Sequence, residues 1–151
     1  MNQQIEKIKK LRAFVLASVK DLSVEQLNAI PAGHNNNIIW NLAHVIAVQQ
    51  GICYLRASLP PVVDQQMVND YKAGTKPEGP VGEATIQNMK SLMLSSLDQL
   101  EADHEKSLFG NYTPWNNRYD VMISTIDEAI DFLLFHEGYH IGTIMALKKY
   151  V

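Results

Sequence analysis

The segment that decides the fold is residues 124–149, which read STIDEAIDFLLFHEGYHIGTIMALKK. Its apolar residues lie almost all round a helix, which is typical of the most buried helix of a bundle. Thr125, followed three residues later by Glu128, forms a capping-box pattern that predicts the start of this helix. Because His136 and His140 are four residues apart, they share one face, separated by about 6 Å of rise.

Three further helical patterns precede this segment. Apolar residues at three- and four-residue spacing predict helices over residues 2–19 and 83–103. Another predicted helix begins at Asn36 or Asn37, both good N-caps, and ends near residue 58, before two consecutive prolines. Four long helices without strands predict an all-α four-helix bundle, in one domain of residues 1–151.

The connections between these helices differ in composition. Residues 59–82 are rich in proline and glycine, and we expect a long crossover connection with a short helix over residues 64–71. Residues 108–122 form a second irregular stretch. Two short connections and one long one would distinguish this bundle from a simple up-down array.

Composition excludes several classes of protein. The net charge of the 151 residues is −3, whereas nucleic-acid-binding surfaces are usually basic, so nucleic acid is not expected as a partner. No apolar run approaches the roughly 20 residues of a membrane span, and the N-terminus lacks the apolar core of a signal peptide. The single cysteine, Cys53, excludes an internal disulfide and indicates the cytoplasm; we expect it to be a small core residue.

The paired histidines raise the question of a metal site. Residues 136–140 read HEGYH, formally the H-E-x-x-H pattern in which the glutamate serves a zinc peptidase as general base. Such a peptidase needs a third ligand downstream, yet residues 141–151 contain no His, Asp or Glu. Glu137 is also turned about 100° from His136. It could face solvent, form a nearby hydrogen bond or support a ligand, and nothing singles it out as a base.

His44, on the helix predicted from Asn36 or Asn37, is the candidate third ligand. A lone buried histidine is more often a hydrogen-bonded core residue, but side-by-side imidazoles are costly to desolvate without partners. Three histidines on two facing helices would leave one metal position open. We therefore favour a metal site of His44, His136 and His140 over a structural polar core. The residues predicted to surround or support it are Trp40, Asn41, Glu137 and Thr143.

Two stretches together carry a resemblance to a known family. IWNLAH at residues 39–44 and HEGYHIG at residues 136–142 resemble the DinB-like (YfiT-type) superfamily, and the likeness extends over essentially the whole chain. The resemblance implies a divalent metal, usually zinc or nickel, held by His44, His136 and His140, and a homodimer. Many superfamily sequences have Gln where this chain has Thr143, so the chain departs from the family pattern beside the ligands.

The resemblance leaves the function open. Characterised superfamily members include transferases and isomerases that use bacillithiol, mycothiol or glutathione. One hypothesis is a metal-dependent transferase in which a low-molecular-weight thiol attacks a small electrophile beneath residues 59–82 and 112–119. Cys53 is roughly opposite His44 in helical phase, so the thiol would be exogenous. The alternative is a non-catalytic metal- or ligand-binding stress-response protein, and a metal-dependent hydrolase ranks third.

Overall fold

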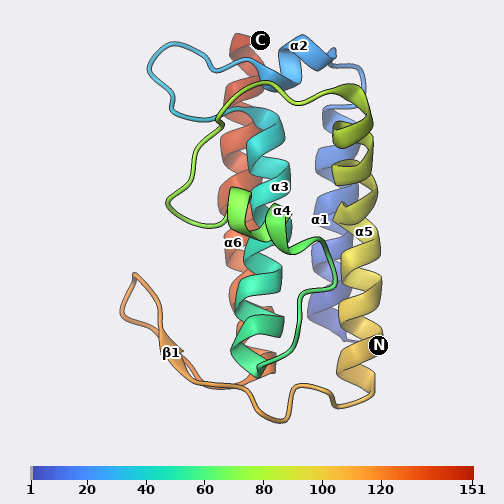
Figure 1. Ribbon diagram of the computed structural model, residues 1–151, viewed down its shortest axis with the longest axis vertical. Helices are drawn as coiled ribbons and strands as arrows, with labels where there is room; N and C mark the ends of the chain where they lie inside the picture. Colours follow the sequence, from blue (N-terminus) through green and yellow to red (C-terminus); the bar gives the residue numbers. More distant parts are fainter. Residues whose placement is uncertain (1) are drawn as a thin grey trace.

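The computed structural model describes residues 2–151 and contains four long helices (Figure 1). They are α1 (Gln3–Ser18), α3 (Ile38–Gln49), α5 (Glu83–Glu105) and α6 (Ile126–Leu147). α3 continues through the π-helical turn η1 (Gln50–Tyr54) and the 3-10 turn η2 (Leu55–Ala57), and α6 through the 3-10 turn η3 (Lys148–Tyr150). The predicted all-α bundle is confirmed.

The helices form a ring in which each packs against two neighbours. α1 contacts α5 and α6, and α3 contacts the same two helices. α1 and α6 run in one direction, whereas α3 and α5 run in the other (Figure 1). Because α3 and α5 are parallel, residues 58–82 must return along the length of the bundle, which is the predicted crossover connection.

All three connections carry short elements of their own. They contain α2 (Val24–Asn28), α4 (Gln65–Tyr71), and the hairpin of β1 (Trp115–Asn116) and β2 (Met122–Ile123). The expectation of two short connections was therefore wrong, since residues 19–37 and 106–125 are nearly as long as the crossover. The predicted helix at residues 64–71 is confirmed, with Asp64 as its N-cap.

Side-chain caps fix where α3 and α6 begin. Oδ1 of Asn37 accepts a hydrogen bond from the backbone N–H of Trp40 at 2.8 Å, which starts α3. Oγ1 of Thr125 accepts one from the N–H of Glu128 at 3.2 Å, which starts α6. These caps fix the helical phase of the residues that follow them, including the histidines.

One sequence argument about membranes was wrong. The segment Ile38–Ala57 has 20 residues and a mean hydropathy of 1.3 in its best window, so it is long and apolar enough to cross a membrane. In the fold, however, 78% of that window is buried among the other helices. Its apolar character is that of a core helix of a soluble domain.

A polar layer lies between two apolar clusters of the core, one of which includes Ile46 and the other Leu100. At its centre lies the fully buried guanidinium of Arg12, on α1. It donates to Glu137 of α6 at 2.6 and 3.0 Å, to Gln49 of α3 at 3.0 Å and to the Met93 carbonyl of α5 at 3.0 Å. One side chain of α1 thus bonds to the three other helices of the bundle.

Candidate metal centre

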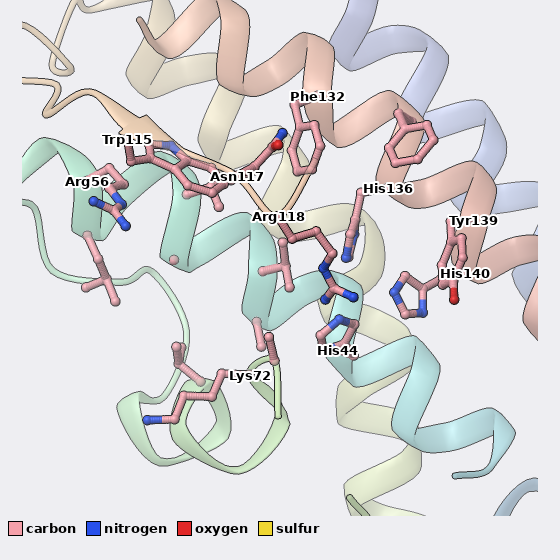
Figure 2. Close-up of a pocket in the computed structure, with 18 of the residues that line it drawn as sticks. His44, Arg56, Lys72, Trp115, Asn117, Arg118, Phe132, His136, Tyr139 and His140 are labelled. Carbon is pink, nitrogen blue, oxygen red and sulfur yellow. The ribbon is translucent and has the colours of Figure 1, made fainter. Parts of the chain in front are cut away.

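Three histidine side chains from two helices meet beside the polar layer. α3 supplies His44, whereas His136 and His140 reach toward it from α6 (Figure 2). One ring nitrogen from each histidine lies within 4.8 Å of those from the other two. The ring centroid of His140 is 4.5 Å from those of both His44 and His136. Imidazole is the commonest protein ligand of metal ions, and this grouping is compatible with binding one.

Hydrogen bonds at Nδ1 hold two of the imidazoles. Nδ1 of His44 lies 2.6 Å from the carbonyl oxygen of Tyr71, at the end of α4, and Nδ1 of His140 lies 2.8 Å from Oδ1 of Asn41. Both oxygens can only accept, so each Nδ1 carries the proton and donates it. The tautomer leaves Nε2 unprotonated on both rings, with a lone pair for a metal.

Asn41, which bonds to His140, is itself held by a second hydrogen bond. Nδ2 of Asn41 donates to the carbonyl of Asn37 at 2.8 Å, which fixes the direction of the amide. Asn41 is fully buried, so water does not compete for these bonds. The predicted neighbour of the triad is therefore placed to orient one imidazole, as outer residues of metal sites commonly do.

His136 differs because its Nδ1 is buried and has no hydrogen-bond partner among residues 2–151. Leaving such a polar atom unpaired typically costs about 1–3 kcal/mol. The ring thus has unused bonding capacity beside two imidazoles with available lone pairs. This combination fits a site for a metal ion better than it fits a self-contained polar core.

Burial keeps the triad neutral. Desolvation is the largest cause that lowers the pKa of His136 to about 2 and the pKa of His140 to about 3, with neighbouring imidazoles and Arg118 adding repulsion. Desolvation also lowers the pKa of His44. Neutral imidazole is the form that binds a metal, so the free protein holds its candidate ligands ready at neutral pH.

The other predicted neighbours divide into two groups. The ring of Trp40 stacks on His44 with centroids 4.5 Å apart, and it limits how that imidazole can turn. Glu137, by contrast, is fully buried against Arg12 in the polar layer, and Oγ1 of Thr143 donates to the Tyr139 carbonyl of its own helix at 3.1 Å. Neither Glu137 nor Thr143 is among the described residues that line the cavity described next.

The triad forms part of the wall of a cavity of about 440 Å³. Further lining residues come from η1, α4, the β1–β2 hairpin and α6, and many of them are apolar or aromatic, such as Ile52, Trp115 and Phe132. The π-helical turn places Gly51 and Ile52 at this wall, and such turns are frequent at functional sites. Cys53 lies in the same turn but is fully buried in the core, as predicted, and burial raises the pKa of its thiol.

Sequence reasoning missed two contributors to this site. The carbonyl of Tyr71 is a backbone group, so no side-chain pattern marks it. Arg118 lines the cavity from the hairpin, and Figure 2 shows its side chain directed toward the histidines. The available signal was its position in the aromatic stretch of residues 112–119, one of two segments expected to cover the site.

A four-helix bundle with three convergent imidazoles at a cavity defines a candidate metal-binding protein. The family model of the DinB superfamily matches residues 7–144, and the chain belongs to this superfamily. A search of curated proteins found no match. The resemblance stated from the two sequence stretches is therefore confirmed at the level of the superfamily.

Acid should destabilise the metal-free protein. In the unfolded chain, His136 and His140 bind protons below about pH 6.5, whereas in the fold their pKa values lie at about 2 and 3. The unfolded state therefore binds more protons between these limits, so stability present above pH 6.5 is lost as the pH falls. The loss at pH 5 should be about 2 kcal/mol for each of these histidines.

Urea unfolding of chelator-treated protein at pH 7, 6 and 5 measures this loss. The double variant His136→Gln/His140→Gln should lose much less stability over that range. His34→Gln, which changes an exposed histidine, is the matched control and should behave as the unmodified protein does. An unfolding free energy that stays constant from pH 7 to pH 5 would contradict the placement of buried neutral histidines.

Proposed function

We propose that the protein binds one divalent metal ion, zinc or nickel, through His44, His136 and His140, and acts on a small molecule in the adjacent cavity. The observation that carries this proposal is the convergence of the three imidazole nitrogens within 4.8 Å at the cavity wall. A site with three protein ligands leaves a coordination position for water or substrate, as catalytic zinc sites do.

The reaction we propose is transfer of a low-molecular-weight thiol to a small electrophile. When bound, the metal would supply an open position at which a thiol releases its proton to water at neutral pH. The sulfur then forms a bond to an electrophilic carbon, and the leaving group departs with the electrons of the bond that breaks. The aromatic walls, including Phe132 and Tyr139, would hold an apolar electrophile and exclude water.

The side chains around the cavity favour this reaction over hydrolysis. Peptidases of the H-E-x-x-H type use the glutamate as general base, but Glu137 bonds to Arg12 and does not line the cavity. Among the described residues that do line it, none is Asp or Glu. A metal-bound thiol would need no such base, because coordination lowers its pKa enough for water to accept the proton at neutral pH.

The thiol must come from outside the chain. Cys53 is fully buried in the core and does not line the cavity, and its raised pKa keeps the thiol protonated. The thiolate is the reactive form of a cysteine, so this side chain is unsuited to attack. A non-catalytic metal-binding protein remains the second hypothesis, since the same triad would bind an ion without turnover.

A thiol screen tests the proposed reaction. Zinc- or nickel-loaded protein is mixed with bacillithiol, mycothiol, glutathione or coenzyme A and with monochlorobimane, and conjugation is followed by fluorescence. We expect at least one thiol to react faster than in the protein-free control, and Cys53→Ala to keep that rate. If no thiol is turned over and none perturbs the visible spectrum of cobalt-loaded protein, the transferase proposal gives way to the binding-protein hypothesis.

A further inference from the structure

The charges around the cavity do not match those of the whole protein. The chain has 16 acidic residues and 13 lysines and arginines, for a net charge of −3. The described residues that line the cavity nevertheless include three cationic side chains, Arg56, Lys72 and Arg118, and no acidic one. Such a one-sided lining attracts anions and repels cations.

Of the three cations that line the cavity, Arg118 is the one whose charge acts on all three histidines. Its field is among the causes that lower the pKa of His44, His136 and His140, and its side chain is directed toward them in Figure 2. None of the ion pairs described for residues 2–151 includes this guanidinium, which lies 6.0 Å from the ring centroid of Tyr119. A guanidinium beside a candidate cation site is repelled by the cation unless an anion lies between them.

The hairpin holds Arg118 in this position. Oδ1 of Asn117 accepts hydrogen bonds from the backbone N–H groups of Tyr119 and Val121 at 2.9 and 3.1 Å, which fixes the turn that carries the arginine. The hairpin also packs on α6, because Tyr119 contacts Phe135 edge-to-face with ring centroids 5.5 Å apart. Arg118 is thus presented by a structured turn attached to the helix that carries two of the histidines.

We propose that Arg118 is a substrate-positioning residue that pairs with a carboxylate of the ligand, between the hairpin and the histidine triad. This inference rests on the proposed function for the metal, but Arg118 belongs to the protein whether or not a metal binds. A guanidinium matches a carboxylate with two parallel hydrogen bonds. The apolar walls beside it, including Trp115 and Phe132, fit an aromatic or aliphatic body. The ligand class is therefore a small carboxylic acid with an apolar body.

The probe is 4-phenylbutyrate, compared with its uncharged amide and with phenyl phosphate. Binding is measured by calorimetry on both chelator-treated and zinc-loaded protein. We expect the carboxylate to bind about tenfold more tightly than the amide in each form, the modest factor reflecting the exposure of Arg118 to solvent. Arg118→Gln should remove that preference. Arg118→Lys should keep part of it, because the charge remains but the two-bond geometry does not.

Lys149→Gln is the matched control, because it removes one positive charge from an exposed position outside the cavity. It should leave the preference for the carboxylate unchanged. The inference is overturned if acid and amide bind equally well, or if phenyl phosphate binds more tightly than the carboxylate. It is also overturned if Arg118→Gln keeps the preference for the carboxylate, or if none of the three probes binds. Loss of metal binding with the carboxylate preference intact would instead overturn only the proposed metal function.

Discussion

Replacing Arg12 by methionine should lower the free energy of unfolding by about 3–5 kcal/mol, because removing one partner of a buried ion pair leaves the other charge uncompensated. The guanidinium is fully buried and donates to Glu137 at 2.6 and 3.0 Å. Its loss would also remove the bonds to Gln49 on α3 and to the Met93 carbonyl on α5. Methionine fills much of the volume but supplies none of these donors.

Urea unfolding at pH 7 measures this effect. Lys10→Met is the matched control, because it removes a positive charge from an exposed position of the same helix and should change stability by no more than about 0.5 kcal/mol. The double variant Arg12→Met/Glu137→Leu should recover part of the loss, since it leaves no unpaired charge in the layer. A loss below about 1 kcal/mol in Arg12→Met would mean that water reaches Glu137 and that the polar layer is not closed.

The ion pair of Arg12 and Glu137 also affects how the histidines are oriented. Glu137 lies between His136 and His140 in the chain but on another side of α6, facing Arg12 instead of the cavity. Anchoring this residue fixes the rotation of α6 about its axis, and with it the direction of both histidines. The sequence H-E-x-x-H thus joins two roles on one helix: imidazoles toward the cavity and a carboxylate toward the core.

The sequence predicts the bundle well because apolar periodicity and capping are local signals. The start predicted at Asn36 or Asn37 corresponds to a hydrogen-bonded cap at Asn37, and the start predicted at Thr125 to one at Thr125. The connections were less predictable. Each two-residue strand of the hairpin is too short for a pattern of period two, and it depends on packing against α6 through pairs such as Trp115 and Phe132.

The histidine triad was predictable for a different reason. His136 and His140 are related by helical spacing, and His44 is the only ionisable residue of α3. The three side chains meet because α3 packs against α6. Arg12 was missed although it follows Ile8 by four residues and precedes Val15 by three, which places it on the buried face of α1. A charged residue at such a helix position usually lies at the edge of the apolar face and reaches solvent. Its burial becomes evident only when its partners on other helices are known.

Replacing His140 by alanine should reduce the affinity for zinc or nickel far more than replacing the residue that supports it. His140 is one of three candidate ligands, whose nitrogens lie within 4.8 Å of one another, and two imidazoles alone would leave an incomplete site. Asn41→Ala would keep all three imidazoles but remove the acceptor 2.8 Å from Nδ1 of His140, so the loss there should be about 10- to 100-fold. Competition with a chromophoric chelator measures both affinities.

The order of these two effects separates a metal site from a polar core. If the triad binds the ion, the number of ions bound per chain should fall from one to zero in His140→Ala. Asn41→Ala should still bind one ion per chain, with weaker affinity. His34→Ala, at an exposed position, should match the unmodified protein and exclude adventitious binding by surface histidines. Circular dichroism and urea unfolding at pH 7 show whether each variant remains folded. One ion per chain, bound equally well by folded His140→Ala and by the unmodified protein, would mean that the metal lies elsewhere and that the three imidazoles are a structural core.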